Sequence, residues 1–320
     1  MRIMVCGGAG FIGSHYLDYL LENYIGDFVL CFDALSYAGK EENFSHHINK
    51  KNFAFVKGDI CNKEEVERAV KKYKIEAIVN FAAQSHVDRS ILSAEEFLRT
   101  NVLGVNVLLE VCRELNLKRF HQVSTDEVYG DLPLESQSKF DESWPIAPSS
   151  AYSASKASAD LLILAQARTH NLPVTISRCC NNFGARQHEE KFIPTMVKHA
   201  LFNKPLPIYG TGENVREWIE VKEHCKAVDI ILRKGKLGQV YNVSGNVLLS
   251  NLQMAKKILN ILQKPQSLIS FVEDRKGHDR KYAVNGDKIK EELGYTPSFD
   301  FEKEFEKCVL YYRDEFLKND

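Results

Sequence analysis

The chain has 320 residues, of which 44% are hydrophobic and 27% are charged, and its formal net charge is -1. This length and apolar content suffice for one large α/β domain with a smaller lobe. The nearly balanced charge provides neither a positively charged surface for nucleic acid nor an acidic tail. No apolar run is long enough to span a membrane and the first residues do not resemble a secretion signal, so we expect a cytoplasmic protein that binds neither membranes nor nucleic acid.

Eight cysteines are scattered along the chain without a C-x-x-C spacing. In a reducing compartment, cysteines in apolar surroundings are usually buried free thiols. We therefore expect neither a disulfide framework nor a metal site.

A glycine-rich turn follows the first predicted strand, residues 3–6, and opens a helical pattern over residues 11–22. In such a turn one glycine permits the tight bend, one lets the backbone approach a pyrophosphate, and one lets the helix pack close to the strand. The phosphates would lie at the helix N-terminus. By itself the pattern also fits an ordinary loop between a strand and a helix. The cofactor-binding residues predicted here are Gly7, Gly10, Phe11, Ile12 and Gly13.

A carboxylate stands at the end of the second predicted strand, residues 28–32. Asp33 follows the glycine-rich turn at the spacing expected of a ribose-binding acid. It would accept hydrogen bonds from a ribose 2′-hydroxyl and would repel a 2′-phosphate. The sequence therefore predicts NAD as the cofactor in preference to NADP.

Strands and helices continue to alternate along the chain. Further strands are predicted at residues 53–56, 77–81, 121–123 and 173–178, and helices at residues 63–73, 94–115 and 150–170. This alternation predicts an α/β fold, a Rossmann-type doubly wound parallel sheet with ligands beyond the carboxyl ends of its strands. The third and fourth strands lead into further cofactor contacts expected from Asp59, Ile60, Ala82 and Ala83.

Two groups of reactive side chains follow the fifth predicted strand. Thr125, Asp126 and Glu127 come directly after it, and Tyr152 and Lys156 are one helical turn apart on the next segment. The charge of Lys156 would lower the pKa of Tyr152, and one of the adjacent carboxylates could stay ionised while the other keeps its proton. Acids in this place could instead cap a helix. Because Tyr152 and Lys156 are present as well, we interpret the five residues as a site of proton and hydride transfer.

The second half of the chain is expected to form a smaller lobe. Residues 189–218 are rich in Pro and Gly and predict irregular loops that cap the sheet. Residues 300–318 predict an amphipathic helix. We accordingly divide the chain into an NAD-binding Rossmann domain at residues 1–175, whose strands continue into the second half, and a mainly substrate-binding lobe at residues 176–320, the two being interleaved.

Seven segments together resemble the extended short-chain dehydrogenase/reductase family, and more closely its nucleotide-sugar 4,6-dehydratase branch. They are residues 7–13, 82–90, 124–130, 152–156, 181–182, 190–191 and 277–282. The likeness covers essentially the whole chain. Its most specific part is the Thr-Asp-Glu triplet, because the glycine-rich turn and the Tyr-x-x-x-Lys pair also occur in epimerases and reductases.

The resemblance implies a role for each catalytic candidate. Tyr152 would take the proton of the C4 hydroxyl, Thr125 would hold the C4 oxygen, and Lys156 would bind the nicotinamide ribose. Glu127 would remove the C5 proton while Asp126 protonates the departing C6 hydroxyl.

The resemblance also implies a substrate site for the sugar, the diphosphate and the base. Its residues would be Ser85, Asn181, Glu190, Lys191, Pro207, Tyr209, Arg216, Arg275, His278 and Tyr282. The positions that depart from the family pattern are Gln84, Cys180, Phe183, Ala185, Glu217 and Glu220. None of these is a catalytic candidate, so the reaction type is expected to hold, whereas Glu217 and Glu220 would lie near the nucleotide and affect its choice.

By this resemblance the chain would be a hydro-lyase that converts a nucleotide-linked hexose, with dTDP-glucose expected, to its 4-keto-6-deoxy product for deoxysugar and surface polysaccharide biosynthesis. NAD would stay tightly bound and be regenerated in each turnover. Two subunits would pair helices 94–115 and 150–170 into a four-helix bundle. The alternatives are a UDP- or GDP-linked glucose or N-acetylglucosamine as substrate, a nucleotide-sugar 4-epimerase, and a non-catalytic NAD-sensing protein.

Overall fold

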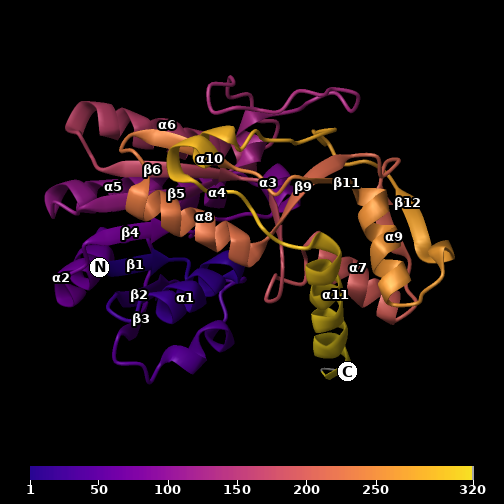
Figure 1. Ribbon diagram of the computed structural model, residues 1–320, viewed down its shortest axis with the longest axis horizontal. Helices are drawn as coiled ribbons and strands as arrows, with labels where there is room; N and C mark the ends of the chain where they lie inside the picture. Colours follow the sequence, from indigo (N-terminus) through magenta and orange to yellow (C-terminus); the bar gives the residue numbers. More distant parts are fainter. Residues whose placement is uncertain (319–320) are drawn as a thin grey trace.

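The computed structural model describes residues 1–318 and is built around one parallel sheet (Figure 1). In spatial order its seven strands are β10 (Gln239–Val243), β6 (Val174–Cys179), β5 (Arg119–Thr125), β4 (Ala77–Asn80), β1 (Arg2–Cys6), β2 (Phe28–Asp33) and β3 (Phe53–Lys57). Neighbouring strands are parallel throughout, so all carboxyl ends lie at one edge of the sheet. The predicted doubly wound Rossmann-type fold is confirmed.

Helices cover both faces of this sheet. The first face carries α1 (Phe11–Asn23) and α8 (Val221–Lys234), and the second carries α2 (Lys63–Tyr73), α5 (Val105–Glu114) and α6 (Ala151–His170). In β1, Ile3 and Val5 pack on the α1 side, whereas Met4 and Cys6 pack on the α2 side. Because side chains alternate along a strand and both faces are covered, the strands are continuous apolar runs.

A smaller lobe lies to the right of the sheet in Figure 1. It contains a three-stranded sheet of β11 (Val247–Ser250), β9 (Val215–Glu220) and β7 (Asn181–Phe183), a pair of β12 (Ile269–Val272) and β8 (Leu206–Tyr209), and the helices α7 (Phe192–Leu201), α9 (Asn251–Ile261) and α11 (Phe301–Lys318). Phe183, Trp218 and Phe305 are buried in its core. The amphipathic helix predicted at residues 300–318 is confirmed as α11.

The prediction of irregular loops over residues 189–218 is wrong. The segment contains α7, β8 and β9, separated by short turns. Pro194 does not prevent the helix, because it lies in the first turn of α7, where backbone N–H groups have no intrahelical partner. Gly210 and Gly212 both have positive φ and make the turn between β8 and β9.

The chain passes between the two parts more than once. After β9 it returns to the main sheet as α8 and β10, enters the lobe as β11 and α9, and returns again as α10 (Asp287–Leu293), which packs against β10. Residues 240–243, which we expected in the lobe, therefore belong to the main sheet.

The remaining elements are short. The helix predicted at residues 94–115 is divided into α4 (Glu95–Leu98), a π-helical segment η3 (Arg99–Gly104) and α5, and α3 (Val87–Leu92) precedes it. The 3₁₀ turns are η1 (Glu41–Asn43), η2 (Ser45–His47), η4 (Asp126–Tyr129) and η5 (Gln266–Leu268). Within residues 1–318 we find no helix with both the length and the apolar character needed to cross a bilayer.

Candidate active site

A cavity of about 420 Å³ opens at the carboxyl edge of the main sheet and is lined by both parts of the chain. Four of the five catalytic candidates line it, the exception being Lys156. All ten residues predicted to bind substrate line the same cavity: Ser85, Asn181, Glu190, Lys191, Pro207, Tyr209, Arg216, Arg275, His278 and Tyr282. The fold thus brings together groups that lie as far apart in the sequence as Ser85 and Tyr282.

The catalytic acids occupy the turn that follows β5. The Thr125 hydroxyl accepts a hydrogen bond from the Glu127 backbone N–H (3.3 Å), so Thr125 caps η4, and it donates to Asp126 Oδ1 (3.2 Å). Asp126 is 1% exposed, and its Oδ2 has no hydrogen-bond partner within residues 1–318. A buried carboxyl oxygen without a partner is costly, so this atom is available to a polar group of a ligand in the cavity.

The two adjacent acids lie in different electrostatic surroundings. Burial raises the pKa of Asp126 well above its usual range, and the charge of Glu127 raises it further. Burial also raises the pKa of Glu127, but the positive charges of Arg275, Arg216 and Lys191 act in the opposite direction. Asp126 is therefore the better proton donor of the pair and Glu127 the better base.

Tyr152 and Lys156 are presented by the first turns of α6, which begins with a reciprocal capping box between Ser150 and Ser153. Our expectation that Lys156 lowers the pKa of Tyr152 is wrong for this structure. Burial raises the pKa of Tyr152, and the negative charges of Glu127 and Asp126 raise it further. Lys156 itself is buried, which lowers its pKa to about 8, and its Nζ donates to the Val123 carbonyl oxygen (2.7 Å).

The glycine-rich turn fits a dinucleotide at its predicted place. A Cβ on Gly7 would lie 2.5 Å from the Ala82 nitrogen, and one on Gly13 would lie 2.2 Å from the Gly7 oxygen, so neither position admits a side chain. Gly10 is the N-cap of α1 and has no side-chain cap, which leaves the first backbone N–H groups of α1 for an anion. Phe11 and Ile12 extend from this turn into the cavity.

The other predicted cofactor residues lie along the carboxyl ends of β2, β3 and β4. Asp33 accepts hydrogen bonds from Ala9 N (2.9 Å) and Leu35 N (2.8 Å), which leaves further lone pairs on its oxygens for a ribose. Asp59 accepts from Cys61 N (2.9 Å), and Ile60 is packed in the core. None of these residues lines the catalytic cavity, and neither do Ala82 and Ala83, which follow β4. The residues present fit NAD: Asp33 would bind a ribose of the cofactor, and the glycine-rich turn would hold its phosphates.

Three cations surround the cavity near Glu127. Lys191 Nζ donates to the Ser85 carbonyl oxygen (2.7 Å), and Arg216 Nη2 donates to the Asp279 carbonyl oxygen (2.9 Å). Arg275 lies 3.8 Å from the Asp88 carboxylate, and its Nε has no partner among the described residues. Free guanidinium and ammonium donors at one wall suit a diphosphate.

The departures at Glu217 and Glu220 do not lie in the nucleotide site, contrary to our expectation. Glu217 is fully buried on β9, where it accepts from Ser244, Asn246 N (2.8 Å) and Val284 N (2.9 Å). Glu220 caps α8 by accepting from the Lys222 and Glu223 backbone N–H groups. Both side chains hold elements together and neither lines the cavity.

The cavity is also lined by residues that the sequence reasoning did not assign to the site, among them Gln187, Trp218 and His224. Trp218 stands two positions after Arg216 on β9, so period-two spacing would have placed both on one face once β9 was predicted as a strand. His224 lies one turn into α8 and has no comparable local signal.

Comparison with known proteins agrees with this site. The family model described as GDP-mannose 4,6 dehydratase matches residues 4–308. The low-salt glycan biosynthesis protein Agl12 of Haloferax volcanii is 48% identical over 98% of both chains. The dTDP-glucose 4,6-dehydratase of Haemophilus influenzae is 42% identical over 98% of both chains. The crystal structure of the dTDP-glucose 4,6-dehydratase DesIV of Streptomyces venezuelae with NAD bound is 42% identical, with a TM-score of 0.94 over 98% of this chain and 97% of that one. The chain therefore belongs to the GDP-mannose 4,6 dehydratase family of nucleotide-sugar dehydratases.

Proposed function

We propose that the protein is an NAD-dependent hydro-lyase that converts dTDP-glucose to dTDP-4-keto-6-deoxyglucose and water. The observation that carries the proposal is the pair of adjacent acids, each in different electrostatic surroundings, that lines one cavity with Tyr152. An epimerase has no need of such a pair, because it removes no water. The relatives named dTDP-glucose 4,6-dehydratase support this substrate, and the name of Agl12 supports a role for the product in glycan assembly.

The chain's own residues would move the protons of this reaction. Tyr152 Oη takes the C4 hydroxyl proton, while the Thr125 hydroxyl holds the C4 oxygen. Glu127 takes the C5 proton, which the new C4 ketone acidifies, and Asp126 gives its proton to the departing C6 hydroxyl. Glu127 then returns a proton to C5. When bound, NAD supplies the hydride acceptor for C4 and the hydride donor for C6.

Protonation of Asp126 also affects Tyr152. Asp126 and Glu127 both raise the pKa of Tyr152, so the neutral form of Asp126 removes one of the two charges that oppose ionisation of the phenol. A proton on Asp126 therefore has two effects: it enables Asp126 to act as the general acid, and it favours the ionised form of Tyr152, the base. What favours Asp126 over Glu127 as the acid is their surroundings, because the positive charges of Arg275, Arg216 and Lys191 act on Glu127 and oppose its protonation.

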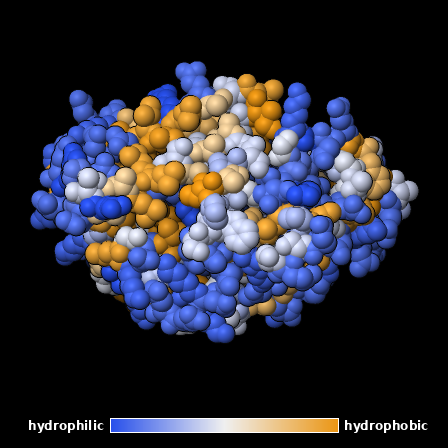
Figure 2. All heavy atoms as spheres, turned by 90° about the horizontal axis from the view of Figure 1, so that it is seen from above, coloured by the Kyte–Doolittle hydropathy of each residue, from blue (hydrophilic) through white to orange (hydrophobic). Residues whose placement is uncertain are grey.

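We further propose a homodimer that forms through α4, α5 and α6. A set of exposed apolar side chains gathers on these packed helices and the adjoining α3 and η3: Ile91, Leu92, Leu98, Leu103 and Leu161. Figure 2 shows a broad apolar patch on the upper side of the molecule, over the half where α6 lies in Figure 1. Exposed apolar patches of this kind on a protein surface mark interfaces.

We also propose that the enzyme works in the cytoplasm. All eight cysteines are free thiols, and all but Cys61 are buried. Thiols remain unpaired most readily in a reducing compartment.

Product analysis tests the reaction and the substrate together. The NAD-loaded protein is incubated with dTDP-, UDP-, GDP- and CDP-linked glucose and with UDP-N-acetylglucosamine, and the products are identified by NMR. We expect a 4-keto-6-deoxy sugar from dTDP-glucose. A C4 epimer would replace the proposed reaction with epimerisation, and a kcat/KM at least about tenfold higher for another nucleotide sugar would replace the proposed substrate.

A further inference from the structure

The catalytic cavity contains a thiol that the proposed proton transfers do not use. Cys179 is the last residue of β6, and its Cα is paired with that of Thr125 on β5 in the parallel register. Paired residues of neighbouring strands present their side chains on the same face. Cys179 is 4% exposed and lines the cavity together with Thr125 and Asp126.

Asn182 fixes the arrangement of the groups around this thiol. Its Nδ2 donates to the Cys180 carbonyl oxygen (3.0 Å) and to Cys179 Sγ (3.4 Å), which sets the orientation of the amide. The amide oxygen then faces His224 Nδ1 at 2.9 Å and must accept a hydrogen bond from it. Nδ1 therefore carries the proton of the neutral imidazole, and the lone pair of His224 is on Nε2.

His224 offers that lone pair inside the cavity. The side chain is fully buried, it lines the cavity, and its Nε2 has no hydrogen-bond partner at standard geometry within the described part of the chain. A buried acceptor without a partner is unfavourable until it receives a proton. Asn182 is hydrogen-bonded to both side chains, so its amide holds the Cys179 thiol and the His224 imidazole in one group at the cavity wall.

We propose that Cys179 is a nucleophilic thiol, with His224 as its proton acceptor and Asn182 as the residue that orients both, and that it makes the catalytic cavity a site of covalent modification by small, uncharged, soft electrophiles. Cysteine reactivity depends on a nearby base and on partial access, and this site has both. Alkylation here would place a new group beside Thr125 and close the cavity to substrate.

The electrostatic surroundings agree with the geometry. Burial alone would raise the pKa of Cys179, but the Cys180 hydrogen bond, the charge and hydrogen bond of His224, and Asn182 lower it to about 5. The titratable groups that face Cys179 from the surrounding elements are Cys180, His224, Cys225, Asp126 and Tyr295. Burial raises the pKa of Cys180, Cys225, Asp126 and Tyr295, which favours the neutral form of each of these four groups.

The modification step is balanced without a co-reactant. With iodoacetamide, the Cys179 sulfur attacks the methylene carbon, an S–C bond forms, the C–I bond breaks and iodide leaves. The thiol proton has already passed to His224 Nε2, so the imidazole becomes an imidazolium and later loses this proton to solvent.

The test is the rate of labelling of each cysteine in the NAD-loaded protein. Iodoacetamide is added at several pH values between about 6 and about 8, and the labelled peptides are quantified by mass spectrometry. We expect the Cys179 rate to be nearly constant over this range, because its thiol is already ionised, and to exceed that of an ordinary thiol about tenfold at the acidic end. Cys61 is the internal control, since it is more exposed but burial and Asp59 raise its pKa to about 11.

Two variants separate the role of His224 as the base from the presence of the neighbouring thiol of Cys180. His224→Gln keeps a polar side chain without a base of suitable strength, and its Cys179 rate should rise with pH by up to about tenfold per unit. Cys180→Ser keeps a hydrogen-bond donor and should leave the label on Cys179. If His224→Gln does not fold, the pH dependence of the Cys179 labelling rate in the unaltered protein still tests the proposal. Absence of label on Cys179, or a Cys179 rate that rises with pH as the Cys61 rate does, would overturn the proposal.

Discussion

Asp126 and Glu127 are neighbours in the chain and differ in what surrounds them. Three cations from distant segments act on Glu127, whereas burial and the charge of Glu127 are the largest influences on Asp126. We expect Asp126→Asn to oxidise C4 still, visible as absorbance of the reduced cofactor, but to slow dehydration by about 10² to 10⁴, the usual contribution of a general acid. A substrate with fluoride in place of the C6 hydroxyl needs no protonation and should recover much of that rate.

The matched variant Glu127→Gln should not recover with the 6-fluoro substrate, because removal of the C5 proton is still required. Rapid-mix analysis of both variants with both substrates checks this. If fluoride restores both variants equally, or neither, the division of roles between the two acids fails even though the dehydratase reaction could stand.

Asp33 gives a prediction about the cofactor. Its two oxygens are held by Ala9 N and Leu35 N, so its position is fixed at the carboxyl end of β2. A 2′-phosphate placed there would meet a buried carboxylate and lose its solvation. Titration of the NAD-free protein should therefore show NAD binding at least about tenfold tighter than NADP. Equal affinities would remove this role from Asp33.

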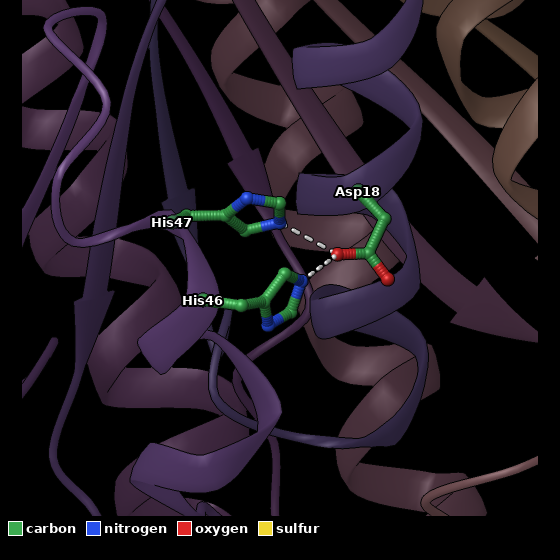
Figure 3. Close-up of side chains that lie close together, drawn as sticks. All are labelled: Asp18, His46 and His47. Atoms are coloured by element: carbon green, nitrogen blue, oxygen red, sulfur yellow. Dashed lines mark hydrogen bonds and ion pairs between the residues drawn. The ribbon is translucent and has the colours of Figure 1, made fainter.

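At the scale of elements, the Asp18 carboxylate on α1 joins its own helix to η2 and to the segment between β7 and α7. Figure 3 shows the imidazoles of His46 and His47, from η2, pointing at the same oxygen of Asp18 on α1, at 2.9 and 2.6 Å. The other oxygen of Asp18 accepts from Arg186 Nη1 (2.8 Å), which lies between β7 and α7. Asp18, His46 and His47 are groups that can also ligate a metal ion. A histidine bound to a metal usually donates its second ring N–H to a hydrogen-bond acceptor. His47 Nδ1 is buried and has no such partner in the part of the chain described, which argues against a metal here. We interpret the cluster as structural. We call Asp18, His46, His47 and Arg186 the clamp, because their contacts hold α1, η2 and the segment between β7 and α7 together.

The clamp has a defined pH dependence. Although burial would raise the pKa of Asp18, hydrogen bonds from His47 and the charge of Arg186 lower it to about 2, below its usual value of 3.8. When folding lowers the pKa of a carboxyl group, the folded state is stabilised at pH values above the pKa of that group in the unfolded chain. This stabilisation is lost as the pH falls through the lower pKa of the group in the folded protein. Asp18→Asn should therefore cost about 1–2 kcal/mol of unfolding free energy near neutral pH, and the cost should shrink below about pH 4.

Urea unfolding of both proteins at neutral and acidic pH measures this difference. Asp314→Asn is the control, because Asp314 also pairs with an arginine but is exposed at the surface, and no loss is expected there. A loss for Asp18→Asn that does not depend on pH would contradict the assignment.

Elements with a regular pattern in their own residues are predictable from the sequence, and α2 has the bounds that its pattern predicts. The same reasoning misjudged α7, because Pro194 reads as a helix breaker unless its position in the first turn is known. Within the site, the acids and Tyr152 are recognisable from local spacing. The cations that act on Glu127, and the approach of His224 to Cys179, depend on contacts between segments far apart in the chain, for which local patterns hold no information.

For the whole molecule, we predict that the apolar surface formed by α3, α4, η3 and α6 beside α5 holds two subunits together. Leu103 and Leu161 are 61% and 56% exposed, and a charge on either would be buried without a partner in such an interface. Leu103→Glu and Leu161→Glu should give monomers by light scattering. Leu237→Glu, on the loop between α8 and β10 and 53% exposed, should leave the dimer intact. A monomeric unaltered protein, or dimers of all three variants, would refute this interface.

The strand order of the main sheet also has a consequence for synthesis on the ribosome. β10, the edge strand beside β6, begins at Gln239, whereas β6 ends at Cys179, so 59 residues lie between the two. At the usual rate of roughly 5–20 residues per second, the nascent chain exposes the open edge of β6 for about 3 to 12 s before its partner emerges. During that interval α8 is also missing or incomplete, so the first face of the sheet lacks part of its cover. Chaperone demand during translation should therefore be concentrated on nascent chains whose length lies between those of the completed β6 and the completed β10.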